Sequence, residues 1–182
     1  MTVETRPWAL VTGCSSGIGR ALVASLRGRG WGVVATARRL DSLADLPPGE
    51  DLRMVQLDVT DAASLERAVA ACQGLRLVAL VNNAGYGQMG PLELLHTDEL
   101  RAQFETNVIG LQAVTSAFLP LLRAHAGPGE GRIVHVASVL GRLSIPMAGA
   151  YNASKHAVVA LAETLRLEIG PALAVILVEP GA

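Results

Sequence analysis

A glycine-rich segment between two largely apolar runs limits what this chain can fold into more than any other feature. Residues Thr12–Gly19 read TGCSSGIG, follow the apolar run Trp8–Val11 and lead into Arg20–Leu26. This order predicts a strand, a glycine turn and a helix. The free backbone N–H groups at such a helix N-terminus, together with the helix dipole, form a site for an anion. Glycines also let the backbone approach a pyrophosphate and let the helix pack tightly on the strand.

The spacing of the glycines, G-x-x-x-G-x-G over Gly13, Gly17 and Gly19, differs from the common dinucleotide pattern G-x-G-x-x-G. The segment alone is therefore also compatible with a turn that merely joins a strand to a helix. A cofactor site requires that the rest of the chain supply a parallel sheet and a reacting group.

Strand-like and helix-like segments alternate along the whole chain. Apolar or alternating runs predict strands over 8–11, 31–37, 52–59, 77–81, 132–137 and 174–178, and helical patterns cover 20–26, 62–71, 97–124 and 150–168. Pro120 lies inside the third helical pattern and predicts a kink or a break there. The alternation predicts an α/β fold, with a doubly wound parallel sheet in a single domain over residues 1–182.

The composition fits a heavily buried chain and argues against several partners. Of 182 residues, 51% are hydrophobic and 17% are charged, as expected for a sheet covered by helices on both faces. The net charge is −1 with scattered basic residues, so we expect no nucleic acid partner. No apolar run approaches the ~20 residues of a membrane span, and no signal-peptide pattern precedes the first strand. We interpret Cys14 and Cys72 as free thiols and expect a cytoplasmic protein.

The only lysine of the chain lies close to one of its two tyrosines. The chain has fourteen arginines and a single Lys155, which suggests a task that a planar, always charged guanidinium cannot perform, with chance as the alternative. Tyr151 precedes it by four residues, so the two side chains share a helix face. A nearby ammonium favours the ionised phenol and brings its proton exchange towards neutral pH. Such pairs are usually surface contacts, but here both partners are rare in the chain.

The end of the second strand favours the phosphorylated form of a nicotinamide dinucleotide. In sites of this type, an acidic residue about 20 positions after the glycines binds the ribose of NAD, whereas a nearby arginine accommodates the 2′-phosphate of NADP. Here Ala37 is followed by Arg38 and Arg39, with no carboxylate before Asp41. This order favours NADP(H), although a solvated charge pair at a strand end is the alternative.

Taken together, these segments resemble the short-chain dehydrogenase/reductase family, in its NADP-preferring branch with a Y-x-x-x-K motif. The matches occur in family order, span residues 12 to 181 and comprise Thr12–Gly19, Asp58-Val59, Asn82-Asn83-Ala84-Gly85, Asn107, Ser138, Tyr151-x-x-x-Lys155 and Pro180-Gly181. The resemblance implies a Rossmann fold. It also implies an NADP(H)-dependent oxidoreductase that interconverts a carbonyl and an alcohol by hydride transfer.

The same resemblance implies catalytic roles for four residues. Tyr151 would be the general acid/base that exchanges a proton with the substrate oxygen, and Ser138 would hydrogen-bond that oxygen. Lys155 would support Tyr151 and bind the nicotinamide ribose, and Asn107 would hold a water that relays protons to Lys155. The implied cofactor-binding residues are Gly13, Ser15, Ser16, Gly17, Ile18, Gly19, Arg38, Asp58, Val59, Asn82, Ala84, Gly85, Tyr151, Lys155, Pro180 and Gly181. No metal is required, and the four histidines show no ligand spacing.

Two other functions fit the same fold. One is a dinucleotide-binding sensor or scaffold without turnover, against which the complete set of four catalytic residues argues. The other is a non-redox lyase or epimerase, which the short length of the chain disfavours. The segments 86–89, 139–142 and 144–147, which we expect near the substrate, are mostly apolar and predict an apolar carbonyl compound or alcohol.

The resemblance further implies a homo-dimer or homo-tetramer, paired through the helices that contain Asn107 and Tyr151. Members of the family continue beyond Pro180-Gly181 into a substrate-covering segment, a helix and a final strand. We therefore expect a C-terminally incomplete domain that lacks the usual substrate lid and last strand. The run 174–178 would then be an apolar edge strand that no charge or proline blunts.

Overall fold

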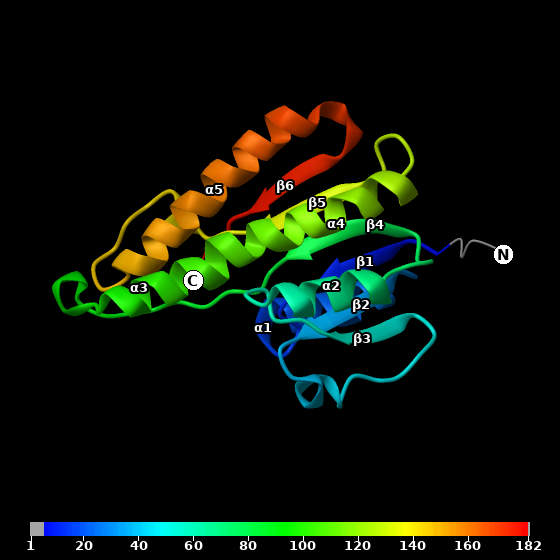
Figure 1. Cartoon of the computed structure of the whole chain (residues 1–182), viewed down its shortest axis with the longest axis horizontal. Helices are drawn as coiled ribbons and strands as arrows, with labels where there is room; N and C mark the ends of the chain where they lie inside the picture. The colour runs from blue at the N-terminus through cyan, green and yellow to red at the C-terminus, as the bar shows by residue number, and fades with distance from the viewer. Residues whose placement is uncertain (1–5, 182) are drawn as a thin grey trace.

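Six parallel strands form one sheet at the centre of the computed structural model, which describes residues 6–181 (Figure 1). The strands are β1 (Trp8–Val11), β2 (Gly32–Ala37), β3 (Leu52–Gln56), β4 (Leu77–Asn82), β5 (Arg132–Val136) and β6 (Ala174–Val178). Their order in space is β3-β2-β1-β4-β5-β6, and every neighbouring pair is parallel. The predicted doubly wound parallel sheet is thereby confirmed. Residues 1–5 and 182 of the predicted domain lie outside the described part.

The order of the strands reverses between β1 and β4. From β1 the chain moves outward to β2 and β3, returns to β4 beside β1, and then continues to β5 and β6 on the other side. Both central strands, β1 and β4, are buried along their whole length, as expected when helices cover both faces. In such sheets ligands bind outside the carboxyl ends of the strands at the point of reversal.

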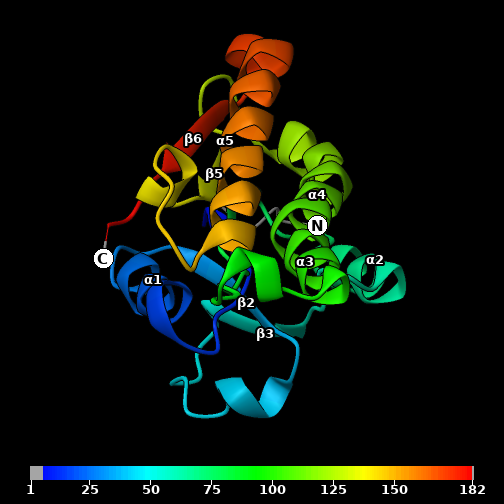
Figure 2. The ribbon, with the colours of Figure 1, turned by 90° about the vertical axis from the view of Figure 1, so that its left-hand side faces the viewer.

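Helices lie on both faces of the sheet, and each face has its own hydrophobic core (Figure 2). The helices are α1 (Gly17–Arg27), α2 (Ala62–Ala71), α3 (Thr97–Phe104), α4 (Leu111–His125) and α5 (Gly149–Ile169). On one face α2 and α4 bury Leu65, Phe118 and Leu122 against the strands. On the opposite face α1 and the short 3-10 helix Leu40–Leu43 bury Val23 and Leu43. α5 lies against α3 and the following segment Glu105–Gly110, and it packs on β6.

The helical pattern from Thr97 to His125 is continuous and contains one wider turn. α3 passes into the π-helical segment Glu105–Gly110, which passes into α4. Pro120 lies within α4, and the helix continues past it to His125, so a break at Pro120 is the wrong prediction. The irregular turn falls around Asn107 instead, which is one of the predicted site residues.

The third strand is shorter than the predicted 52–59, because β3 ends at Gln56. Asp58 then builds a turn: its Oδ1 accepts hydrogen bonds from the backbone N–H of Thr60 at 3.0 Å and from the Thr60 hydroxyl at 2.8 Å. Asp61 caps the following helix by accepting from the backbone N–H of Ala63. The turn leaves Asp58 and Val59 at the carboxyl edge of the sheet.

One helical stretch, Thr97–His125, is long and apolar enough to cross a membrane by length and composition alone. The mean hydropathy of its most apolar window is 1.2, and 39% of that window is buried inside the molecule. Core helices of soluble proteins meet the same criterion, and Phe118 and Leu122 of this stretch belong to the core. The stretch is therefore weak evidence for a membrane span.

The edge strand β6 is well covered on one face only. Val175 is buried, and Leu177 packs against the α5 residues Val158 and Val159. The alternate residues of the strand face the other way, and Ile176 and Val178 are 38% and 41% exposed. β6 therefore differs from β1 and β4, which are buried on both faces.

Candidate active site

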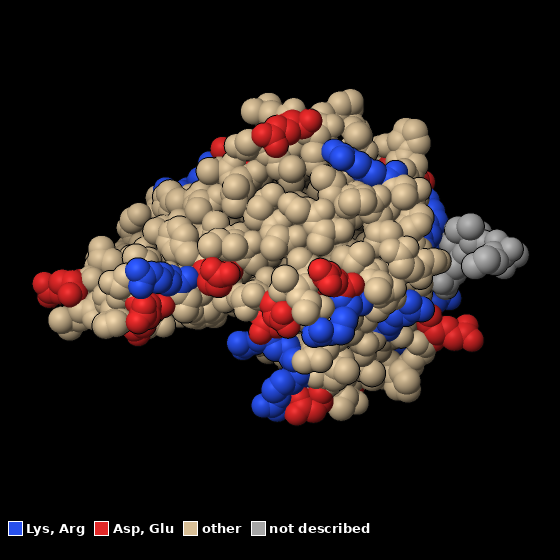
Figure 3. All heavy atoms as spheres, in the orientation of Figure 1, with Lys and Arg blue, Asp and Glu red and all other residues tan. Residues whose placement is uncertain are grey.

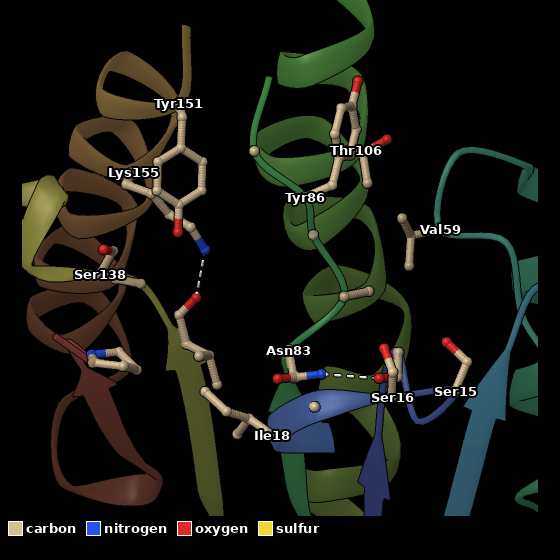
Figure 4. A pocket seen from close by; sticks show the side chains of 18 of the residues that line it. Ser15, Ser16, Ile18, Val59, Asn83, Tyr86, Thr106, Ser138, Tyr151 and Lys155 are labelled. Atoms are coloured by element: carbon tan, nitrogen blue, oxygen red, sulfur yellow. Dashed lines mark hydrogen bonds between the residues drawn. The ribbon is translucent and has the colours of Figure 1, made fainter. Parts of the chain in front are cut away.

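A cavity of about 1040 Å³ opens at the carboxyl ends of the strands, where the strand order reverses (Figure 4). It brings together segments from nearly the whole length of the chain. The predicted site residues that line it are Gly13, Ser15, Ser16, Gly17, Ile18, Arg38, Asp58, Val59, Ala84, Gly85, Ser138, Tyr151, Lys155, Pro180 and Gly181. Three predicted residues, Gly19, Asn82 and Asn107, do not line it.

The glycine segment presents the free N-terminus of α1 to this cavity. Gly13 and Gly17 have φ values of +72° and +56°, a backbone conformation that side chains other than glycine rarely adopt. Ser16, the N-cap residue, makes no capping hydrogen bond through its side chain, and the first turn of α1 contains no acidic residue. The first amides of the helix therefore face the cavity without a competing side-chain acceptor, which fits a pyrophosphate.

Gly19 contributes close packing rather than a cavity wall. A Cβ atom at this position would lie 2.4 Å from the carbonyl oxygen of Gly13 and 2.5 Å from Nδ2 of Asn83. Asn83 Nδ2 donates to the carbonyl oxygens of Thr12 and Gly13 at 2.9 and 3.1 Å. Thr12 Oγ1 in turn accepts from the backbone N–H groups of Asn83 and Ala84. These bonds fix the loop after β4 to the glycine segment.

Two neighbouring asparagines lie differently relative to the cavity, and of the two only Asn83 lines it. Asn82 is buried away from the cavity, where its Nδ2 donates to Thr115 Oγ1 at 2.8 Å and lies 3.2 Å from Nδ1 of His135. Asn83, which was given no role of its own, lines the cavity. Successive residues of a strand point to opposite sides, so only one of two adjacent side chains can face the glycine segment.

Lys155 is nine-tenths buried at the start of α5. Its Nζ donates to the carbonyl oxygen of Val136 at 2.8 Å and lies 5.6 Å from the centre of the Tyr151 ring (Figure 4). Burial lowers the pKa of Lys155 to about 8, because a charged amine loses solvation there. An ammonium has three donors, so the bond to Val136 leaves two for other acceptors in the cavity.

Ser138 and Tyr151 lie on the same wall as Lys155 (Figure 4). Ser138 Oγ accepts from the backbone N–H of Leu140 at 3.1 Å, which leaves its hydroxyl proton to be donated elsewhere. Within the described residues, no partner is found for the Tyr151 hydroxyl. Two hydroxyl donors and an ammonium thus face one space, an arrangement suited to an oxygen that gains negative charge.

Asn107 does not line the cavity, but it is hydrogen-bonded to Tyr86, which does. Its Oδ1 accepts from the backbone N–H of Tyr86 at 3.1 Å, and its Nδ2 donates to the carbonyl oxygen of Tyr86 and to Ser154 Oγ. The side chain therefore holds the loop after β4 and the second turn of α5. Asn107 lies in the π-helical segment, and the water relay from it to Lys155 stays a prediction.

The two arginines after β2 have different environments. Arg39 forms an ion pair with Asp41, with 2.8 Å between Nη2 and Oδ2. Arg38 lines the cavity, and among the described residues it has no ion-pair partner. The resemblance named Arg38, and not Arg39, as a cofactor-binding residue, although both follow the strand directly. The structure leaves the guanidinium of Arg38 available to an anion.

The segment after β6 is held beside Ser138. The carbonyl oxygen of Pro180 accepts from the backbone N–H of Val139 at 3.1 Å. Arg142 forms ion pairs with Glu179 at 2.9 Å and with Glu163 of α5 at 2.8 Å. These bonds bring Pro180 and Gly181 into the cavity wall.

Several cavity residues had no predicted role, namely Ala37, Leu57, Thr60, Asn83, Thr106, Val136 and Ala137. Thr60 and Thr106 belong to the Asp58 turn and the π-helical segment, which no local sequence pattern predicted. Of the segments expected near the substrate, Tyr86, Gly87 and Met89 line the cavity. Residues 144–147 line a separate hollow of about 430 Å³ next to Leu92 and His156 instead.

The fold and this site define a dinucleotide-binding α/β domain with a serine, a tyrosine and a lysine at the point of strand reversal. The chain belongs to the short-chain dehydrogenase family, because the family model described as "short chain dehydrogenase" matches residues 7–182. It is 38% identical over 176 residues to the uncharacterized oxidoreductase YbbO of Escherichia coli K12, covering 94% of this chain and 64% of that protein.

Solved structures agree with this assignment. A short-chain dehydrogenase from Burkholderia cenocepacia in complex with NADP has a TM-score of 0.85 and 32% identity, covering 100% of this chain and 74% of its own. A 3-ketoacyl-(acyl-carrier-protein) reductase from Brucella melitensis complexed with NADH has a TM-score of 0.89 and 27% identity, covering 100% and 77%. The chain is shorter than the proteins that it matches.

Proposed function

We propose that this chain contains the cofactor-binding and catalytic site of an NADP(H)-dependent oxidoreductase that interconverts a carbonyl and a primary or secondary alcohol. The observation that supports this most directly is the placement of Ser138, Tyr151 and Lys155 on one wall of the cavity, facing the uncapped start of α1. The chain spans 64% of the length of the YbbO protein, so the activity of the whole protein is part of the proposal.

The residues present fit a phosphorylated dinucleotide. The first turn of α1 would hold the pyrophosphate, and the guanidinium of Arg38, which has no ion-pair partner among the described residues, would face the 2′-phosphate. Ala37 offers no carboxylate to bind an unphosphorylated ribose. The solved relatives include complexes with NADP and with NADH, so the preference rests on Arg38 and Ala37 of this chain.

The cofactor, when bound, supplies or accepts the hydride. The chain positions the cofactor and the substrate and transfers the proton. In the direction of reduction, the Tyr151 hydroxyl donates its proton to the carbonyl oxygen, and in oxidation it receives the proton of the alcohol. Ser138 donates a hydrogen bond to the same oxygen. The ammonium of Lys155 lies 5.6 Å from the centre of the Tyr151 ring and has two further donors for hydroxyl groups of the bound ribose.

The substrate side of the cavity is apolar. The Tyr86 and Met89 side chains line it and are 41% and 57% exposed. An apolar carbonyl compound or alcohol would cover these side chains, which supports a substrate of low polarity. Asp58 is the only carboxylate among the residues of the described part that line the cavity, and it lies at the opposite end with Val59 and Thr60.

We also propose a homo-dimer or homo-tetramer in the cytoplasm. Figure 3 shows a broad surface without charged side chains over the middle of α4 and the N-terminal part of α5, which suits pairing with another copy. Both cysteines are free and buried, consistent with a reducing compartment.

The deciding experiment compares wild type with Tyr151→Phe, which keeps the ring and removes the hydroxyl. With NADPH and a panel of aldehydes and ketones, we expect kcat of the variant to fall by about 10²–10⁴-fold, the usual contribution of general acid/base catalysis. NADPH fluorescence should give a Kd within about twofold of wild type. A variant with wild-type kcat would refute the role of Tyr151.

The alternatives give other results. A sensor or scaffold would bind NADPH and turn over no carbonyl compound in the wild-type protein. A lyase or epimerase would convert its substrate without net change in NADPH absorbance.

A further inference from the structure

Gln103 is a fully buried polar side chain that does not line the cavity. It nevertheless forms hydrogen bonds with two backbone groups of the loop after β4, which does line the cavity. It belongs to α3 and is 0% exposed. Its Oε1 accepts from the backbone N–H of Gln88 at 2.7 Å, and its Nε2 donates to the carbonyl oxygen of Tyr86 at 2.8 Å. One amide therefore binds the main chain on both sides of Gly87.

A buried amide is tolerated only when its donor and acceptor both find partners. Leucine or methionine would fill the same space without this requirement, so packing alone does not explain a glutamine here. Both partners of Gln103 are backbone groups of one loop. The residue thus fixes a specific loop conformation.

The neighbouring turn of the same helix reinforces this hold. Asn107, four residues further on, binds the N–H and the carbonyl oxygen of Tyr86, so this carbonyl accepts from both side-chain amides. Tyr86 and Gln88 are thereby fixed to the helix through three backbone groups. Gly87, between them, has no such bond.

Gly87 is the part of the loop that approaches the proposed acid/base. A Cβ atom on Gly87 would lie 3.4 Å from Cδ2 of Tyr151 and 3.4 Å from Cε of Met89. In Figure 4 the loop with Tyr86 and the helix with Tyr151 form facing walls of the cavity. A shift of the loop by a fraction of this distance would change the width of the space beside the Tyr151 ring.

We infer that Gln103 is a positioning residue for the substrate: by holding Tyr86 and Gln88, it sets the wall that faces Tyr151. The inference rests on the proposed function, because it assigns the effect to turnover. Gln103 touches neither substrate nor cofactor, and it acts through the loop.

The test uses Gln103→Leu, with Gln112→Leu as the matched control, because the amide of Gln112 contacts only Ser116 on the surface of α4. Hydrogen exchange of individual amides should be about tenfold faster at Gln88 in Gln103→Leu, because one hydrogen bond is lost, and should be as in wild type in the glycine segment.

We expect kcat/KM of Gln103→Leu for the carbonyl substrate to fall by roughly 10- to 100-fold, because misplacing a reacting group slows the reaction by such factors. Kd for NADPH should stay within about twofold, and Gln112→Leu should match wild type throughout.

A second variant, Gln103→Glu, separates positioning from loss of folding. A protonated carboxyl group can still accept from Gln88 and donate to Tyr86, whereas an ionised one would face the Tyr86 carbonyl without a proton to donate. We expect kcat/KM of this variant, relative to wild type at the same pH, to decline as the pH rises through titration of the new carboxyl group. Thermal unfolding followed at each pH shows that the compared protein is folded, and this variant replaces Gln103→Leu if that one does not fold.

The outcomes are distinct. Wild-type exchange at Gln88 in Gln103→Leu, or faster exchange with unchanged kcat/KM, would overturn the inference and leave the proposed function standing. Wild type without turnover of any carbonyl compound would overturn the proposed function and, with it, the assignment of Gln103 to substrate positioning, although the exchange data would still show whether Gln103 fixes the loop.

Discussion

The buried charge of Lys155, which the proposed active site needs, lowers the stability of the fold. Its burial lowers the pKa to about 8, whereas the ordinary value is 10.5. Between these two pH values the unfolded chain binds more protons than the folded one, so the free energy of unfolding rises with pH across this window. Below pH 8 the folded protein keeps a buried charge, at a cost of about 3 kcal/mol from the size of the shift.

Lys155→Met should therefore be more stable than wild type at pH 7, by about 1–3 kcal/mol, and should lose turnover. The difference in the free energy of unfolding should shrink as the pH approaches 10.5. Urea denaturation at pH 7 and 9.5 measures it. Burial raises the pKa of Cys14 to about 11 and that of Cys72 to about 12. Both thiols therefore lower the free energy of unfolding as the pH rises above 9. This effect is the same in wild type and variant, so it does not change the difference between them. A difference independent of pH would contradict the explanation.

Arg38 is the residue on which the cofactor preference depends. We expect wild type to prefer NADPH over NADH in kcat/KM by roughly 10–150-fold, since a charge-assisted hydrogen bond contributes about 1.5–3 kcal/mol. The double variant Ala37→Asp with Arg38→Ala should reverse or abolish this preference. Arg39→Ala is the matched control, because Arg39 is paired with Asp41. An unchanged preference in the double variant would show that Arg38 does not bind the phosphate.

At the scale of elements, the local patterns predicted most of what the structure contains. The strand, glycine turn and helix from Trp8 to Arg27 are encoded in contiguous residues, and α2 spans the predicted residues 62–71. These features need no knowledge of distant parts of the chain. The pairing of Tyr151 with Lys155 was predictable for the same reason, since both lie on one turn of α5.

The features that were missed depend on contacts between distant segments. The π-helical segment places Asn107 so that its amide meets Tyr86 and Ser154, and nothing in its own sequence marks such a turn. Gln103 was overlooked because its hydrogen-bond partners are backbone groups. Every residue has such groups, so no sequence motif identifies them. The placement of Asn82 and Asn83 depends on distant contacts as well: Asn82 contacts Thr115 and His135, whereas Asn83 donates to the glycine segment.

At the scale of the whole molecule, β6 is an edge strand of the sheet formed by residues 6–181, and it has exposed apolar side chains. Ile176→Lys places a charge on the uncovered face, and charged edge residues oppose pairing with other strands. We expect this variant to keep the fold and to scatter less light than wild type on heating at equal concentration. Leu167→Lys, which adds the same charge at an exposed position of α5, should leave scattering unchanged. Equal scattering by wild type and Ile176→Lys would show that β6 does not drive association.

Of the six described strands, β1 is synthesised before the others, and it lies in the middle of the sheet. β1 pairs with β2 soon after it emerges, but its other neighbour is β4, so that pairing must wait until the chain has passed Leu77. Pairing β1 with β4 closes a long loop, and its entropy cost must be met before the contacts of the pair stabilise the fold. Parallel sheets whose paired strands are distant in sequence therefore fold slowly. On the ribosome, one side of β1 stays open while the intervening residues are being added. Protection of the nascent chain during this interval, by chaperones or by rapid translation up to Asn82, should therefore determine how much of this protein reaches its native state.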